Sequence, residues 1–154
     1  MNHDKYLRLN KACLVDLQCQ WRMPTEKVDY DKLFMHYTVG IDYSLKEKEN
    51  DQHQFSMMID VEVNQSQSLP GYNIAIKGVL NFVISDSTPL YEISREKLMH
   101  YVAVEKSIAY MREQISEITK RFPFGRYQLK AIDMQQLYAE KQARIKKIEK
   151  NANS

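Results

Sequence analysis

Apolar and polar residues alternate along four stretches in the first half of the chain. The clearest is residues 33–45, where every odd position is apolar and most even positions are polar or glycine, with Phe34 as the exception. A period of two places alternate side chains on opposite faces of a strand. The pattern therefore predicts strands over residues 12–23, 33–45, 53–64 and 72–84.

The connections between these stretches carry the signals of strand ends and turns. Pro24 ends the first stretch, because proline cannot donate to a strand ladder. The charged run 46–51 contains no apolar residue and predicts a hairpin between the second and third strands. Pro70-Gly71 predicts a turn before the fourth strand, and Gly78 within that strand predicts a bulge or a close backbone approach.

Two features of the predicted faces indicate contacts between copies of the chain. In the first strand the odd positions from Cys13 to Met23 form an apolar face, opposite a polar one. The largely polar sheet face nevertheless carries four apolar residues, Leu14, Phe34, Met58 and Val83. Exposed apolar residues in such a group mark contact surfaces. Together with a heptad-like seam on the following helix, they predict a homo-oligomer.

Beyond residue 94 the hydrophobic period changes from two to three and four. Ser94 is a suitable N-cap, and a helix is predicted over residues 95–121, stopped by Phe122-Pro123-Phe124-Gly125. Its apolar stripe consists of Tyr101, Val104, Ile108, Met111, Ile115, Ile118 and Phe122. A second, shorter helix begins at Asp133, which has capping-box spacing with Gln136.

Strands followed by helices predict an α+β fold with helices packed on an antiparallel sheet. We expect one domain over residues 1–154, consisting of a four-stranded antiparallel sheet, a long helix and a shorter C-terminal helix. The segments 1–11 and 149–154 are expected to be flexible ends. The length of 154 residues suits a single domain with its own core.

Composition and charge change this picture little. Hydrophobic residues make up 44% and charged residues 27%, as in ordinary globular proteins, and the net charge of +2 does not indicate a nucleic-acid partner. The sequence has no apolar run long enough to span a membrane and no signal-peptide pattern, so we expect a cytoplasmic protein. Cys13 and Cys19 lie about 20 Å apart along one strand, too far to pair with each other there. Five basic residues lie near the end of the sequence and are typical of a solvated helix face: Lys141, Arg144, Lys146, Lys147 and Lys150.

The residue types that carry out catalysis are present without the spacing that catalysis needs. The four histidines have no metal-ligand spacing with one another or with the cysteines, and four glycines do not form a phosphate-binding loop. Asp60 and Glu62 lie on the same face of the third predicted strand. Two carboxylates with this spacing on a strand usually face solvent and do not form a catalytic acid–base pair. Phe124 and Tyr127, near Arg126, are of the types that stack on nucleic-acid bases. We favour the interpretation that these aromatic side chains pack on the core where the helix ends. We therefore expect no enzyme, metal or cofactor, no nucleic-acid partner and no membrane insertion.

At two places the chain resembles the SecB-like protein-export chaperones. Residues 15–24 resemble the first strand of that family, with Asp16, alternating apolar residues and a closing proline. Residues 108–124 resemble its long helix and Phe-Pro exit, and residues 128–138 resemble the lead into its last helix. The order of elements over residues 12–142 is similar as well.

The resemblance implies a twisted four-stranded sheet carrying two helices, with subunits assembled as a dimer of dimers, a tetramer. It implies an ATP-independent holdase that binds unfolded polypeptides in apolar grooves and keeps them competent for export by the SecA motor. Of the acidic residues that dock SecA in that family, Asp16 is present, whereas Gln20 and Ala75 replace others and the tail is basic. Some SecB-like proteins instead serve an antitoxin, and this alternative fits the lost acids about as well.

Candidate groove residues are apolar or aromatic side chains near the predicted turns and helix ends, each of which also suits the core or a subunit interface. They are Phe34, Met58, Leu69, Tyr72, Phe122, Phe124, Tyr127, Leu137 and Tyr138. Flexible methionines and rigid aromatics suit a surface that must accept many sequences. Two further alternatives are a binding protein dedicated to one partner or small ligand, and an enzyme using a cavity between sheet and helices.

Overall fold

A computed structural model of the chain describes residues 5–66, 69–86 and 94–153. The elements are β1 (Leu7–Arg22), α1 (Tyr30–Leu33), β2 (Val39–Lys48), β3 (Asp51–Val63), β4 (Gly71–Ile84), α2 (Arg95–Lys97), the π-helical turn η1 (Leu98–Val102), α3 (Ala103–Thr119) and α4 (Met134–Ala152). The strands form one antiparallel sheet in the order β1-β4-β3-β2. The predicted α+β fold, with a four-stranded antiparallel sheet followed by two helices, is confirmed.

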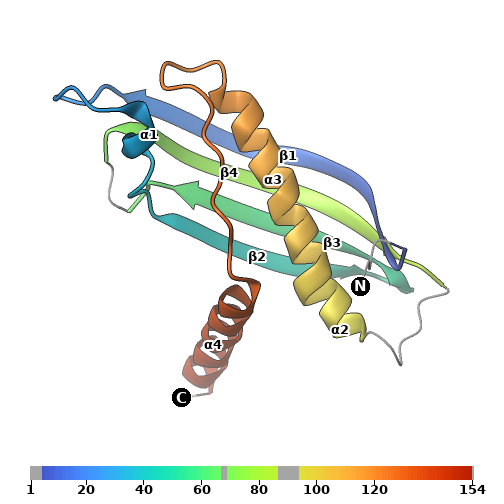
Figure 1. The fold of residues 1–154 in the computed structure, drawn as a ribbon. Coiled ribbons are helices and arrows are strands. Elements are labelled where there is room, and N and C mark those ends of the chain that lie inside the picture. The colour runs from blue at the N-terminus through green and yellow to red at the C-terminus, as the bar shows by residue number, and fades with distance from the viewer. Residues whose placement is uncertain (1–4, 67–68, 87–93, 154) are drawn as a thin grey trace.

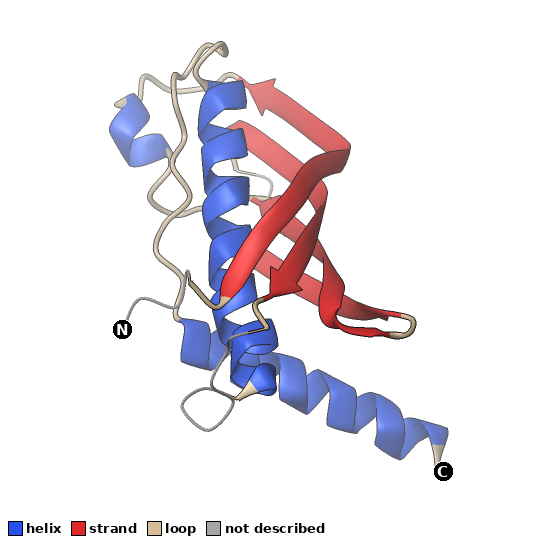
Figure 2. Cartoon of the chain, turned by 90° about the vertical axis from the view of Figure 1, so that its right-hand side faces the viewer, coloured by secondary structure: helices blue, strands red, loops and turns tan. Residues whose placement is uncertain are grey.

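One long helix, made of α2, η1 and α3 in succession, crosses a single face of the sheet (Figures 1 and 2). Its start is as predicted, because the Ser94 hydroxyl accepts a hydrogen bond from the Lys97 amide at 3.1 Å. Its apolar stripe packs on β3 and β4. We call the sheet face that it covers the inner face and the opposite one the outer face.

The core lies between α3 and the inner face of β3 and β4. Alternate residues of both strands are fully buried there, from Phe55 to Val63 in β3 and from Tyr72 to Ile84 in β4. Gly78 lets the helix approach, since a Cβ at this position would lie 3.1 Å from the sulfur of Met111. The predicted close approach at Gly78 is therefore found, and a β-bulge lies opposite it in β1.

Strand β1 differs from its prediction in extent and in facing. It begins at Leu7, so residues 7–11, which we expected to belong to a flexible end, pair with β4. Two bulges, between Leu9 and Lys11 and between Leu14 and Asp16, each shift the facing of the strand. Leu14 therefore shares the inner face with Leu17, whereas Cys13 pairs with Val79 and leaves the face predicted for it. A strict period of two cannot reveal an inserted residue.

The second strand was predicted to begin six residues too early. Residues 33–38 form the end of α1 and the following turn, and β2 begins at Val39. The apolar residues in this segment are needed for packing, because Leu33 and Tyr37 are buried against the start of β4. Their alternation imitates a strand although they belong to a helical turn.

The C-terminal helix starts where the sequence predicted, with the Asp133 carboxylate accepting a hydrogen bond from the Gln136 amide at 3.1 Å. It extends over 19 residues to Ala152, so residues 149–152 of the expected flexible end are helical. Residues 1–4 and 154 of the expected ends lie outside the described residues, whereas residues 5, 6 and 153 are described as turns, with Tyr6 buried. Helix α4 leaves the body beside β2 and projects away from it (Figure 2). No helix in the described residues is long and apolar enough to cross a membrane.

Replacing Gly71 by alanine should destabilise the fold strongly. Gly71 has φ +101°, and an added Cβ would lie 1.9 Å from the hydroxyl of Tyr37. We expect a loss of about 3 kcal/mol or more in the free energy of unfolding, measured by urea denaturation. Gly125→Ala is the matched control, because Gly125 also has a positive φ of +76° but open space around it. It should cost only about 1 kcal/mol, and equal losses would contradict the steric explanation.

Candidate functional site

Seven aromatic rings meet where β1 ends and β4 begins. Each has its ring centroid between 5.3 and 6.2 Å from that of at least one other member. We call this set the aromatic cluster: Trp21, Phe34, Tyr37, Tyr72, Phe122, Phe124 and Tyr127. Its members come from β1, the turn after α1, β4 and the segment that follows α3. The cluster thus joins four parts of the chain that are distant in sequence.

Two buried hydroxyls fix the segment after α3 on the sheet. The Tyr72 hydroxyl donates to the Gly125 carbonyl at 2.7 Å and accepts from the Phe124 amide at 3.1 Å. The Thr119 hydroxyl donates to the Ile115 carbonyl and accepts from the Tyr127 amide, both at 2.8 Å. Buried backbone groups that would otherwise lack partners at a helix end are satisfied in this way.

The tyrosines of the aromatic cluster act as neutral hydrogen-bonding groups. Burial raises the pKa of Tyr37 to about 12 and also raises the pKa of Tyr72 and of Tyr127. The Tyr37 hydroxyl accepts from the Tyr72 amide at 2.9 Å and donates to the Pro70 carbonyl at 2.8 Å. None of these groups ionises near neutral pH, so the cluster provides shape and apolar area.

An apolar surface extends from the aromatic cluster along β1. Helix α3 packs on β3 and β4, which leaves the side chains of the edge strand partly uncovered. We call the following set the β1 surface: Leu9, Val15, Leu17, Trp21 and Met23, whose exposed fractions range from 38% to 53%. Trp21 links the two features, because its ring meets Phe124 edge to face while 47% of the residue is exposed. Large apolar residues grouped in this way indicate a contact surface.

Of the nine residues predicted for a groove, five lie in the aromatic cluster. Tyr72, Phe124 and Tyr127 are buried there, and Phe34 and Phe122 are partly buried. Leu69 packs partly buried against the same core. Trp21 and Tyr37 were not among the predicted residues, although Trp21 ends a clear alternating stretch just before a proline.

The other predicted residues lie elsewhere. Met58 is on the outer face of the sheet with 42% of its surface exposed. Asp16, the predicted docking residue, is exposed on the outer face opposite Lys77. Leu137 is buried on α4, and Tyr138 lies beside it in a second group of rings. The candidate residues therefore do not form one continuous surface within a single copy of the chain.

Helix α4 is attached to the body by its first half. Tyr138 stacks on Tyr101 at 4.8 Å between ring centroids and donates to Glu96 at 3.0 Å. Asp42 of β2 forms ion pairs with Lys141 at 3.1 Å and with Arg144 at 3.4 Å. A cavity of about 680 Å³ lies between this helix and the edge of β2, lined by a mixture of acidic and basic side chains. Among the described residues no group of histidine, cysteine or acidic side chains is placed to hold a metal.

His100 lies in this attachment. Its ring is 6.1 Å from Tyr43 and 5.8 Å from Tyr138, and its Nδ1 is buried without a hydrogen-bond partner among the described residues. Burial lowers the pKa of His100, Lys141 lowers it further, and Glu96 opposes them. Protonation of this histidine is therefore disfavoured in the attached state.

Replacing Tyr72 by phenylalanine should cost about 1–3 kcal/mol of unfolding free energy. The ring would stay, but the Phe124 amide and the Gly125 carbonyl would lose their partner. Tyr43→Phe is the matched control, because the Tyr43 hydroxyl is buried with no partner among the described residues. The control should be neutral or slightly stabilising by urea denaturation, and a larger loss there than in Tyr72→Phe would contradict this account.

Acidification should weaken the attachment of α4 through His100. The pKa of His100 is lower when folded than its ordinary value of 6.5, so its contribution is fully present above 6.5 and falls as the pH drops below it. We expect the thermal unfolding midpoint to fall between about pH 7.5 and 5.5, and to fall less in His100→Gln. His36→Gln, at an exposed histidine, should behave like the parent. An unchanged pH dependence in His100→Gln would show that another group is responsible.

Comparison with known proteins finds solved structures that are similar to this chain. No family model matches the sequence, and no curated protein matches it. A solved SecB-like chaperone of Mycobacterium tuberculosis, in complex with a ChAD peptide from the HigA1 antitoxin, is similar over 84% of this chain and 92% of its own, with a TM-score of 0.55 and 16% identity. A protein of unknown function from Streptococcus agalactiae covers 81% of this chain and 97% of its own, with a TM-score of 0.44 and 10% identity. The first likeness shows that the chain has the fold of a SecB-like chaperone, as the sequence resemblance predicted.

Proposed function

We propose that this protein is a holdase chaperone that binds apolar segments of non-native polypeptides without using ATP. The observation that carries the proposal is the β1 surface, a set of partly exposed apolar side chains of which Leu9, Leu17 and Trp21 lie opposite inner-face residues of β4, with Trp21 in contact with the aromatic cluster. Apolar contacts are non-directional, so such a surface accepts many sequences. The neutral, buried tyrosines beside it support binding rather than chemistry.

The size of the surface favours weak, repeated binding. Covering a half-exposed side chain such as Trp21 or Leu17 contributes on the order of 1 kcal/mol, since full burial of a large apolar side chain is worth about 1.5–3 kcal/mol. One copy of the surface would therefore hold a client loosely. We propose that several copies act together in a homo-oligomer, a dimer of dimers, because linked sites raise avidity without new contacts.

A chaperone dedicated to one partner is the second candidate function. The SecB-like chaperone of Mycobacterium tuberculosis was solved with a peptide of an antitoxin, which is a peptide ligand on a similar fold. On the outer face, where docking to the SecA motor was expected, Asp16 stands opposite Lys77 in the strand register, and Lys77 forms an ion pair with Asp60 at 3.7 Å. Mixed charge on this face favours a role other than export. We propose that the protein carries out this role in the cytoplasm and without catalysis.

The β1 surface can be tested through Trp21. Trp21→Ala should weaken suppression of light scattering by a refolding, aggregating client several-fold, because Trp21 provides the largest exposed apolar area on β1. Ile148→Ala is the control, since Ile148 is 67% exposed on the projecting half of α4. Trp21→Ala should cost about 1–2 kcal/mol of stability because its ring is half-buried, and Ile148→Ala about 0.5 kcal/mol or less, so both variants should stay folded.

The results of these measurements distinguish the general holdase from the dedicated chaperone, and one result contradicts the holdase proposal. If the parent protein suppresses no aggregation at a tetramer-equivalent excess of the 18.2 kDa chain, the holdase proposal is wrong. If it protects one partner and no general client, the dedicated chaperone is favoured. Light-scattering mass near that of four chains would support the oligomer, and a monomer would contradict it.

A further inference from the structure

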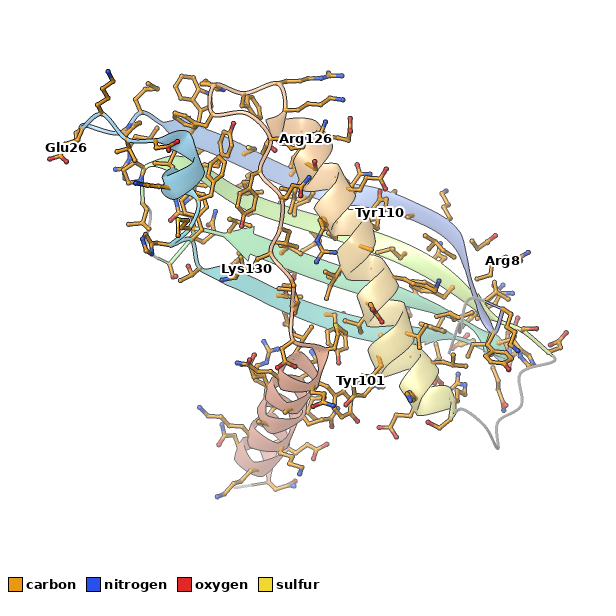
Figure 3. All side chains as sticks on the ribbon, viewed as in Figure 1. Arg8, Glu26, Tyr101, Tyr110, Arg126 and Lys130 are labelled. Carbon is orange, nitrogen blue, oxygen red and sulfur yellow. The ribbon has the colours of Figure 1, made fainter. Side chains whose placement is uncertain are left out.

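The border of the aromatic cluster at the end of α3 is rich in positive charge. Lys120, Arg121 and Arg126 are exposed in the segment that carries Phe122 and Phe124 (Figure 3 labels Arg126). Between residues 114 and 132 the sequence contains a single acidic residue, Glu117. We call Lys120, Arg121 and Arg126 the basic rim.

Glu117 shows that the three cations act on one region. Lys120 forms an ion pair with it, and Lys120, followed by Arg126 and Arg121, lowers the pKa of its carboxyl group. One carboxylate cannot balance three cations, so a net charge of about +2 remains. The C-terminal end of α3 contributes about half a negative charge, which is smaller than that excess.

The backbone places these cations directly beside the aromatic side chains. The turn after α3 is closed by hydrogen bonds from the Phe122 amide to the Thr119 carbonyl and from the Gly125 amide to the Phe122 carbonyl, both at 3.0 Å. Phe124 in turn contacts Trp21 on β1. Across the cluster, the sequence 22–32 contains three basic and three acidic residues and is neutral overall. The charge asymmetry therefore comes from the basic rim.

We propose that the site selects extended polypeptide segments in which apolar residues are flanked by acidic ones. This inference rests on the proposed function and names its substrate class. The apolar residues cover Trp21 and the β1 surface, and the flanking carboxylates face the basic rim. Rim charges alter association and selectivity more than total affinity, and their effect is screened by salt. The preference is therefore largest at low ionic strength.

Three synthetic peptides with one shared core of leucine and phenylalanine test this directly. They carry aspartate, asparagine or lysine on both sides of the core. Trp21 is the single tryptophan of the chain, so its fluorescence reports binding at the site itself. We expect the aspartate peptide to bind about tenfold more tightly than the lysine peptide at about 20 mM salt, and the difference to shrink at about 300 mM.

Variants that remove charge from the exposed surface test whether the basic rim causes the preference for the aspartate peptide. The combined variant Lys120→Gln, Arg121→Gln and Arg126→Gln should lose the preference, whereas Glu117→Gln should increase it by removing the carboxylate on which the three cations act. The combined variant Lys146→Gln, Lys147→Gln and Lys150→Gln removes the same charge from the projecting part of α4. It should keep the preference of the parent.

The possible results distinguish this inference from the function on which it rests. Equal binding of all three peptides, or tighter binding of the lysine peptide, overturns the inference while leaving a holdase without charge selectivity. No change of Trp21 fluorescence with any peptide overturns both, and would be the result if a second copy of the chain covered β1. A loss of preference in the α4 variant as large as in the rim variant also overturns it.

Discussion

The hydroxyl of Tyr72 connects the sheet to everything that follows the long helix. Its ring stands at the centre of the aromatic cluster on the first residues of β4, and its oxygen satisfies both Phe124 and Gly125. Together with the Thr119 hydroxyl, it satisfies the backbone groups of the chain leaving α3 and so stabilises the path of this segment over the inner face. The position of the candidate site, of the basic rim and of the path to α4 depends on these hydrogen bonds of Tyr72.

The site exists because coverage of the sheet is incomplete. One helix crosses the inner face (Figure 1) and packs on β3 and β4. Several apolar side chains of the edge strand β1, among them Leu17 and Trp21, stay partly exposed. A fold that buried Leu17 and Trp21 under a second helix would be more stable and would have no binding surface. Such a compromise between stability and exposed apolar area is what the proposed holdase function would require.

Most of the fold could be predicted because strands and helices differ in hydrophobic period, and caps such as Ser94 and Asp133 mark where helices begin. The errors arose where apolar residues serve packing rather than a period, as at Tyr37, or where one residue is inserted, as beside Leu14. Five of the seven residues of the aromatic cluster were among the groove residues predicted from the sequence. Their exposure could not be predicted, because Trp21 and Tyr72 are paired neighbours in the sheet and only Tyr72 is buried, under other rings of the aromatic cluster.

The two bulges of β1 have a consequence for the solubility of the protein. A 16-residue edge strand with exposed apolar side chains is the type of template on which sheets of different molecules polymerise. Each bulge interrupts the ladder and increases the local twist, so the strand offers only short straight segments to another strand. The chain can therefore expose apolar side chains on a long edge strand and still resist edge-to-edge polymerisation.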